Sequence, residues 1–205
     1  MGYRVSVLLK ILFLIAIVLL LQSCGRSKVE TQAYVDNYTR IINDMKSQAR
    51  IEIIKRGSEA IISYRKSGLL DVDAAERAQN SLIEGIRLDS ISLQNAIALK
   101  SPDAKTKEIT NELVKGINSI IEGNIIFASN YSKAKDQNVE ERKLTIINVR
   151  PGMKFLAEGL NSEVSSIGSL QIYIKDNNLK GGEDIAHWYT VFKMESDNIR
   201  EFLKN

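Results

Sequence analysis

The side chains most often used for catalysis and metal binding are scarce in this sequence. Its 205 residues include one histidine, His187, and one cysteine, Cys24. A closed zinc site or a haem site usually takes several histidine or cysteine ligands. We therefore expect no metal, no haem and no other cofactor, and a single cysteine leaves no partner for a disulfide within the chain.

One short acidic stretch, Asp71-Val72-Asp73, begins like a calcium-binding loop. Glu76 and Leu82 occupy the sixth and twelfth places, where such a loop needs glycine and glutamate. We interpret Asp73 and Glu76 instead as a capping box that starts a helix. Because the sequence also lacks a phosphate-binding glycine loop, a Gly-x-Ser-x-Gly elbow and a metalloprotease helix motif, we predict that the protein is not an enzyme.

The N-terminal stretch has the arrangement of an export signal. Arg4 and Lys10 give a basic start, residues 11–21 form an unbroken apolar run of eleven residues, and Leu21-Gln22-Ser23-Cys24 closes it. That run is well short of the roughly 20 apolar residues that cross a bilayer. The stretch resembles a bacterial lipoprotein signal peptide with its lipobox.

This resemblance implies that Cys24 carries a diacyl lipid on its sulfur and that the bond before it is cut. It also implies acylation of the new amino group. Gln22 departs from the small residue usual at its position, and the alternatives are an ordinary secretory signal or an uncleaved anchor. We predict a signal peptide over residues 1–23 and a lipidated cysteine with a polar tether over residues 24–31, anchored to a membrane by lipid alone.

The remaining chain is predicted to be one all-α domain over residues 32–205, a bundle of about five to six helices. Two prolines, Pro102 and Pro151, interrupt apolar spacings of three and four residues. Ser101 is expected to cap the helix that contains Pro102 in its first turn, and Asn138 with Glu141 to form a capping box. We expect a break at Pro151, so the predicted helices cover residues 32–66, 74–99, 102–135, 139–149, 153–175 and 183–203.

Six glycines fall inside these predicted helices, where each costs ~1 kcal/mol relative to alanine. Gly116 and Gly123 are seven residues apart and share one face. We interpret them as positions of close helix packing; kinks and a ligand groove are the alternatives. The six are Gly57, Gly85, Gly116, Gly123, Gly159 and Gly168.

Two regions are candidates for contact with a partner. His187 and Trp188 begin the densest aromatic cluster, although packing of Trp188 in the core with His187 exposed is the favoured interpretation. Lys46 and Arg50 begin a stretch with a net charge of +4 between residues 46 and 66, which could meet anionic lipid headgroups or form an ordinary solvated face.

The function expected from these observations is a membrane-anchored bacterial envelope lipoprotein, non-enzymatic, that binds a protein or envelope partner. Loss of Arg4 and Lys10 lowers the net charge from +3 to +1, which argues against a nucleic-acid partner. Gly25, in place of the aspartate that retains some lipoproteins at the inner membrane, favours the outer membrane. The mature chain also resembles small helical envelope lipoproteins of the YiaF type, a likeness that assigns no functional residue. The alternatives are a small-ligand carrier with an interhelical pocket and an inhibitor or immunity protein.

Overall fold

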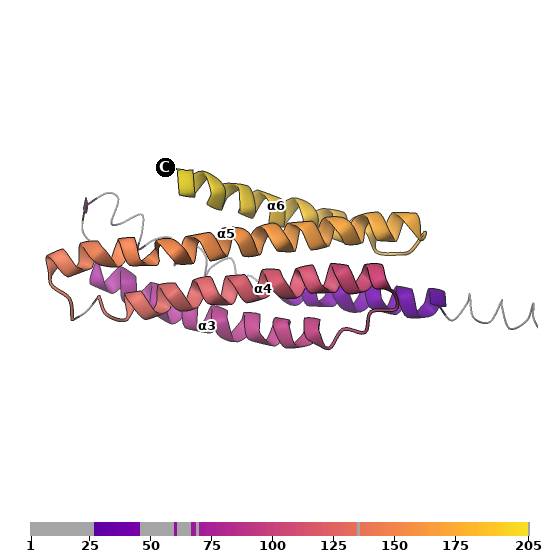
Figure 1. Cartoon of the computed structure of the whole chain (residues 1–205), viewed down its shortest axis with the longest axis horizontal. Coiled ribbons are helices and arrows are strands. Elements are labelled where there is room, and N and C mark those ends of the chain that lie inside the picture. Colours follow the sequence, from indigo (N-terminus) through magenta and orange to yellow (C-terminus); the bar gives the residue numbers. More distant parts are fainter. Residues whose placement is uncertain (1–26, 46–59, 61–66, 69, 135, 205) are drawn as a thin grey trace, which may run out of the picture.

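The computed structural model describes residues 27–45, 60, 67–68, 70–134 and 136–204. Within this part of the chain the regular structure is entirely helical, which confirms the predicted all-α fold. The helices lie side by side along one long axis (Figure 1). They are an N-terminal helix over residues 27–45, α3 Val72–Ile97, α4 Ala104–Tyr131, α5 Val139–Asp176 and α6 Gly182–Lys204.

Neighbouring helices in the chain pack against one another: α3 against α4, α4 against α5, and α5 against α6. Helix α6 runs along the outer side of α5 (Figure 1). Its Ile185 and Phe192 are fully buried, so this helix contributes to the core as expected from its aromatic residues. Together the helices form a bundle whose apolar faces meet along most of its length.

The predicted tether is helical over the residues of it that the structure describes. The expected tether over residues 24–31 is already helical at Ser27. Thr31 is buried, and its hydroxyl donates to the carbonyl oxygen of Ser27 at 2.6 Å. The chain therefore enters the folded domain within three residues of Cys24.

Side-chain caps set the starts of the next helices. The Asn138–Glu141 capping box is confirmed: the Asn138 side chain accepts from the Glu141 N–H at 3.0 Å, and Glu141 accepts from the Asn138 N–H at 2.8 Å. The cap expected at Asp73 lies two residues earlier, because the Asp71 carboxylate accepts from the Ala74 N–H at 2.7 Å.

Helix α4 is capped by Asp103 rather than by Ser101, which corrects the predicted start. The Asp103 carboxylate accepts from the Thr106 N–H at 2.7 Å, and the Thr106 hydroxyl accepts from the Asp103 N–H at 3.1 Å. Pro102 consequently lies just before the cap, outside the helix.

The predicted break at Pro151 is wrong. Helix α5 is continuous from residue 139 to residue 176, with Pro151 inside it, although proline removes one helical hydrogen bond and costs ~3 kcal/mol in a helix interior. Val149 and Met153 on either side of the proline are buried in a core cluster with Phe127 of α4. Their burial favours the helical path on both sides of the proline.

Glycines allow α4 and α5 to approach closely at two levels. A Cβ on Gly116 would lie 2.9 Å from the carbonyl oxygen of Gly159, and a Cβ on Gly159 would lie 2.7 Å from that of Gly116. One heptad along α4, a Cβ on Gly123 would lie 2.8 Å from the carbonyl oxygen of Gly152. No side chain fits between these backbones, so the close-packing interpretation of Gly116 and Gly123 is confirmed; Gly57 lies outside the described residues.

The apolar core forms two clusters. The first contains Tyr34, Tyr38, Leu113, Ile117 and Phe192, with other residues of the N-terminal helix, α4, α5 and α6. The second lies toward the far end of the bundle and joins the first half of α3 to the second half of α4. The glycine contacts of α4 with α5 hold the stretch where the two clusters meet.

We predict that Gly116→Ala and Gly159→Ala each destabilise the fold. The higher helix propensity of alanine would by itself stabilise the fold by up to ~1 kcal/mol. A methyl group in these contacts forces the helices apart, which lowers the free energy of unfolding by ~1 to 3 kcal/mol. Chemical denaturation compares the free energies of unfolding.

Gly182→Ala is the matched control, because its Cβ would meet its nearest neighbour, Ile174, at an ordinary 3.5 Å. If Gly116→Ala and Gly159→Ala were as stable as the Gly182→Ala control, the close contact between α4 and α5 would be contradicted.

Candidate functional site

Of the predicted contact residues, the structure describes His187 and Trp188. Cys24, Lys46 and Arg50 lie outside the described residues. His187 is exposed, while Trp188 is half-buried against the first core cluster. Their rings meet nearly edge to face with centroids 5.1 Å apart. This arrangement agrees with the interpretation in which Trp188 packs in the core, and His187 is the solvent-accessible residue of the pair.

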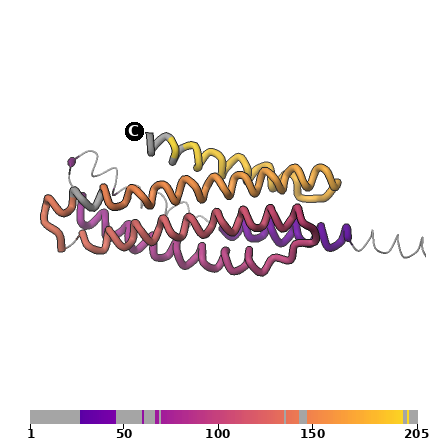
Figure 2. Tube along the Cα trace, in the orientation of Figure 1, coloured from indigo at the N-terminus to yellow at the C-terminus, as the bar shows by residue number. Residues whose placement is uncertain are grey.

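A groove lies elsewhere, beside the N-terminal helix at the end of the bundle that contains the loop from α3 to α4. Helix α3 ends at Ile97, and the described part of the N-terminal helix extends past that end of α3, as the chain trace shows (Figure 2). The loop from α3 to α4 covers only part of the exposed helix face, which leaves a groove of about 810 Å³. Its walls are Glu30, Ala33, Tyr34, Asn37, Arg40 and Ile41 from the N-terminal helix, and Asn95 with residues 98–102 from the α3 end and loop.

The groove follows one stripe of the N-terminal helix. Residues from Glu30 to Ile41 at spacings of three and four cover roughly 16 Å along the helix axis, at ~1.5 Å per residue. The groove is open to solvent along this length and presents polar and apolar groups side by side. Its walls carry one carboxylate, Glu30, and no histidine or cysteine.

Hydrogen bonds fix the wall that Tyr34 forms. The Tyr34 hydroxyl donates to the carbonyl oxygen of Thr106 at 3.0 Å and lies 3.0 Å from the Thr110 hydroxyl. Burial raises the pKa of Tyr34 well above its ordinary value, and the Thr110 contact partly opposes that rise. Thr110 also lies 3.3 Å from Ser101 in the loop, so the two walls are joined through α4.

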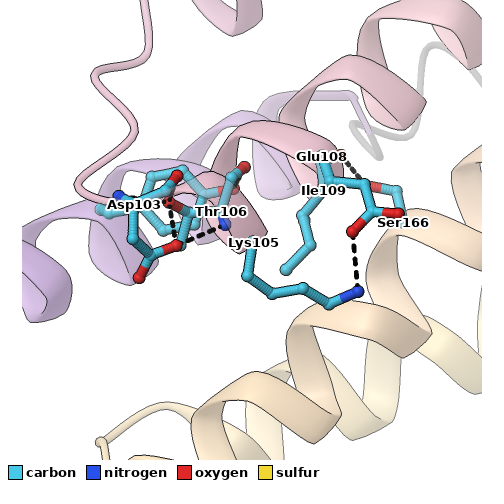
Figure 3. A network of polar contacts seen from close by, with 7 residues as sticks. Asp103, Lys105, Thr106, Glu108, Ile109 and Ser166 are labelled. Atoms are coloured by element: carbon cyan, nitrogen blue, oxygen red, sulfur yellow. Dashed lines mark hydrogen bonds and ion pairs between the residues drawn. The ribbon is translucent and has the colours of Figure 1, made fainter.

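The same end of the bundle is tied together by Asp103 and Tyr173. The Tyr173 hydroxyl of α5 donates to Asp103 at 2.5 Å, while Asp103 also caps α4 (the cap is shown in Figure 3). One heptad further into the bundle, the Ser166 hydroxyl donates to the carbonyl oxygen of Ile109 at 2.7 Å (Figure 3). These two hydrogen bonds between α4 and α5 hold the helices in one register next to the groove.

The surroundings of Asp103 and Tyr173 shift the pKa of both side chains. Burial acts to raise the pKa of Asp103, but hydrogen bonds from the Thr106 N–H and the Tyr173 hydroxyl outweigh it and hold the pKa below its ordinary value. Burial, followed by the hydrogen bond to Asp103, raises the pKa of Tyr173 to about 12. The ionised carboxylate and the neutral phenol are therefore the stable pair at neutral pH.

Two cations, Arg40 and Lys100, line opposite walls of the groove. Arg40 Nη2 donates to the Asn37 side-chain oxygen at 3.1 Å, which is a neutral partner. Sequence analysis missed these residues, because a groove formed by one helix and a distant loop has no motif. The only available signal was the Ser101-Pro102 boundary, which marks where the preceding helix stops.

Comparison of the chain with models of protein families, with curated proteins and with solved structures finds no match. Among the described helices, none combines the length and apolar character that a membrane span requires. The described residues also contain no cluster of three or more acidic, histidine or cysteine side chains suited to a metal ion. Interpretation of the site therefore depends on its own geometry.

We predict that Tyr173→Phe raises the pKa of Asp103 toward its ordinary value, because the variant removes a donor that stabilises the carboxylate. NMR titration of the Asp103 side-chain carbon measures this pKa directly. An identical titration curve in the parent and the variant would show that the hydroxyl does not stabilise the charge.

The sign of the linked stability follows from the lowered pKa. The stabilisation from ionised Asp103 is complete above the unfolded pKa, about 3.9, and is lost as the pH falls through the lower folded pKa. Asp103→Asn keeps a capping acceptor but has no charge, so we expect its stability to fall less than the parent's between about pH 5 and pH 2.

Proposed function

We propose that this protein is a lipid-anchored, non-enzymatic envelope lipoprotein that binds a protein or envelope partner in the groove beside its anchor. The observation that carries the proposal is the position of the groove. The described chain is helical from Ser27 onward, and Glu30, six residues after Cys24, already lines the groove. Three residues from Cys24 to Ser27 span at most about 10 Å, so lipid on Cys24 would hold the groove within reach of a membrane surface.

The open shape of the groove supports a partner that is bound from outside. A carrier of small apolar ligands needs an enclosed apolar cavity, whereas polar groups line much of this groove. Three of the glycines that suggested an interhelical pocket, Gly116, Gly123 and Gly159, instead lie close to the backbone of the opposing helix. An inhibitor or immunity protein remains one form of the proposal, in which the partner is a toxin or hydrolase.

The position of the groove also affects the proposed role of the basic stretch that begins at Lys46. The N-terminal helix carries the chain from Ser27 to Met45, a rise of about 27 Å at ~1.5 Å per residue. Lys46 and Arg50 of that stretch lie outside the described residues, so we propose the groove as the part of the described chain that makes a contact near the membrane.

Cys24→Ala should release the protein from the membrane fraction, because no apolar run after Cys24 approaches the length of a membrane span. Cell fractionation and metabolic labelling with a fatty acid test this expectation. Fatty-acid label that persists on the variant would contradict lipidation at Cys24.

A photoreactive amino acid tests the groove itself. Placed at Asn95, an exposed position in the groove wall, it should form an adduct with one envelope component in intact cells. The same group at Lys154, which is exposed on α5 outside the groove, is the control and should not form that adduct. Equal adducts at both positions, or none at Asn95, would contradict a partner site in the groove.

A further inference from the structure

We propose that the groove binds a phosphate group, with Arg40 and Lys100 as its principal ligands. This inference rests on the proposed function, because it assigns a chemical class to what the groove binds. The ligand class is a small phosphate ester, either free or as the headgroup of a lipid.

The first argument is that neither cation is neutralised by the described part of the chain. Arg40 has the neutral Asn37 as its hydrogen-bond partner, and Lys100 has no hydrogen bond or ion pair there. Three other cations of the described chain form an ion pair with a glutamate three residues away in the sequence, at 2.6 to 3.6 Å. These pairs are Arg87 with Glu84, Lys105 with Glu108, and Lys115 with Glu112.

The second argument is that the two cations stand on different elements. Arg40 belongs to the N-terminal helix and Lys100 to the loop after α3, so a ligand between them contacts both walls. The Asn37 contact limits the motion of the guanidinium on its own helix. A guanidinium and an ammonium are suited to phosphate oxygens, with which they form charge-assisted hydrogen bonds.

The other residues that line the groove suit a phosphate ester better than inorganic phosphate. Asn95 and Ser101 add a carboxamide and a hydroxyl that can bond the alcohol part of an ester, and Leu99 and Ile41 provide an apolar side. Glu30, the only carboxylate of the lining, is ten residues from Arg40, about 15 Å along the helix. The lining thus carries two positive charges and one negative charge, with the negative charge at the anchor end.

The experiment is calorimetric titration of the mature lipidated protein in a neutral detergent. The probes are sn-glycerol 3-phosphate, inorganic phosphate and monomeric dihexanoyl phosphatidylglycerol, with glycerol as the uncharged control. Stronger binding of glycerol 3-phosphate would identify a free ester as the source, and stronger binding of the short-chain lipid would identify a headgroup; either supports the inference. Binding of none of the phosphate probes, or equal binding of glycerol, would overturn it.

Arg40→Gln and Lys100→Gln should each weaken binding about tenfold, because each removes a charge-assisted hydrogen bond. Lys107→Gln is the matched control, since Lys107 is exposed nearby on the first turn of α4 but does not line the groove. An equal loss in all three variants would show attraction to general surface charge and overturn the site. Failure of these titrations alongside a groove-specific adduct at Asn95 would reject the phosphate ligand alone and leave the partner site in place.

Discussion

The close approach of α4 and α5 is the constraint on which the rest of the structure depends. The two helices are antiparallel: from Ile109 to Gly123, seven residues forward along α4 correspond to seven residues back along α5, and the step from the Asp103 cap to Ile109 is six residues. Successive levels of this register are Asp103 with Tyr173, Ile109 with Ser166, Gly116 with Gly159, and Gly123 with Gly152. A shared heptad spacing keeps the same faces together along the whole interface.

The kind of contact changes along this register. Toward the groove, hydroxyl groups bond to a carboxylate and to a backbone carbonyl, and these bonds are specific to one alignment of the helices. Toward the far end, glycines bring backbone against backbone, where dispersion contacts are many and side-chain entropy is not lost. The polar levels fix the register, and the glycine levels fix the distance between the axes.

The groove arises from a difference in length between helices that this interface holds in place. Helix α3 ends at Ile97, while the described part of the N-terminal helix extends further (Figure 2), and the loop after α3 must reach the Asp103 cap at the start of α4. Asp103 is itself held by Tyr173 of α5. The position of Lys100 opposite the N-terminal helix is thus a consequence of the α4–α5 register, and the proposed site depends on that register although neither glycine pair touches it.

Sequence reasoning could predict what local spacing determines. The helical class follows from apolar periodicity, the start of α5 from the Asn138–Glu141 box, and the packing role of Gly116 and Gly123 from their heptad separation. Their partners Gly152 and Gly159 could not be assigned, because pairing between helices is not encoded in local spacing. Gly152 in particular follows Pro151 and suggested a break, whereas burial of the neighbouring residues keeps the helix continuous.

The groove could not be predicted for the same reason. Arg40 and Lys100 are sixty residues apart, and each alone looks like an ordinary surface cation. Ser101 is a good capping residue by type, yet Asp103 has both the stronger acceptor and Thr106 at the correct spacing, so it starts the helix. Because Asp103 rather than Ser101 caps α4, the loop before the helix is longer, and residues of this loop form one wall of the groove.

Interhelical nuclear Overhauser effects between glycine α-protons test the central claim most directly. The structure predicts cross-peaks between Gly116 and Gly159 and between Gly123 and Gly152, together with contacts between Ser166 and Ile109 that report the same register. Their joint appearance would establish both the distance and the alignment of α4 and α5. Cross-peaks for Ser166 and Ile109 without either glycine pair would show aligned helices that stand apart, which contradicts the account.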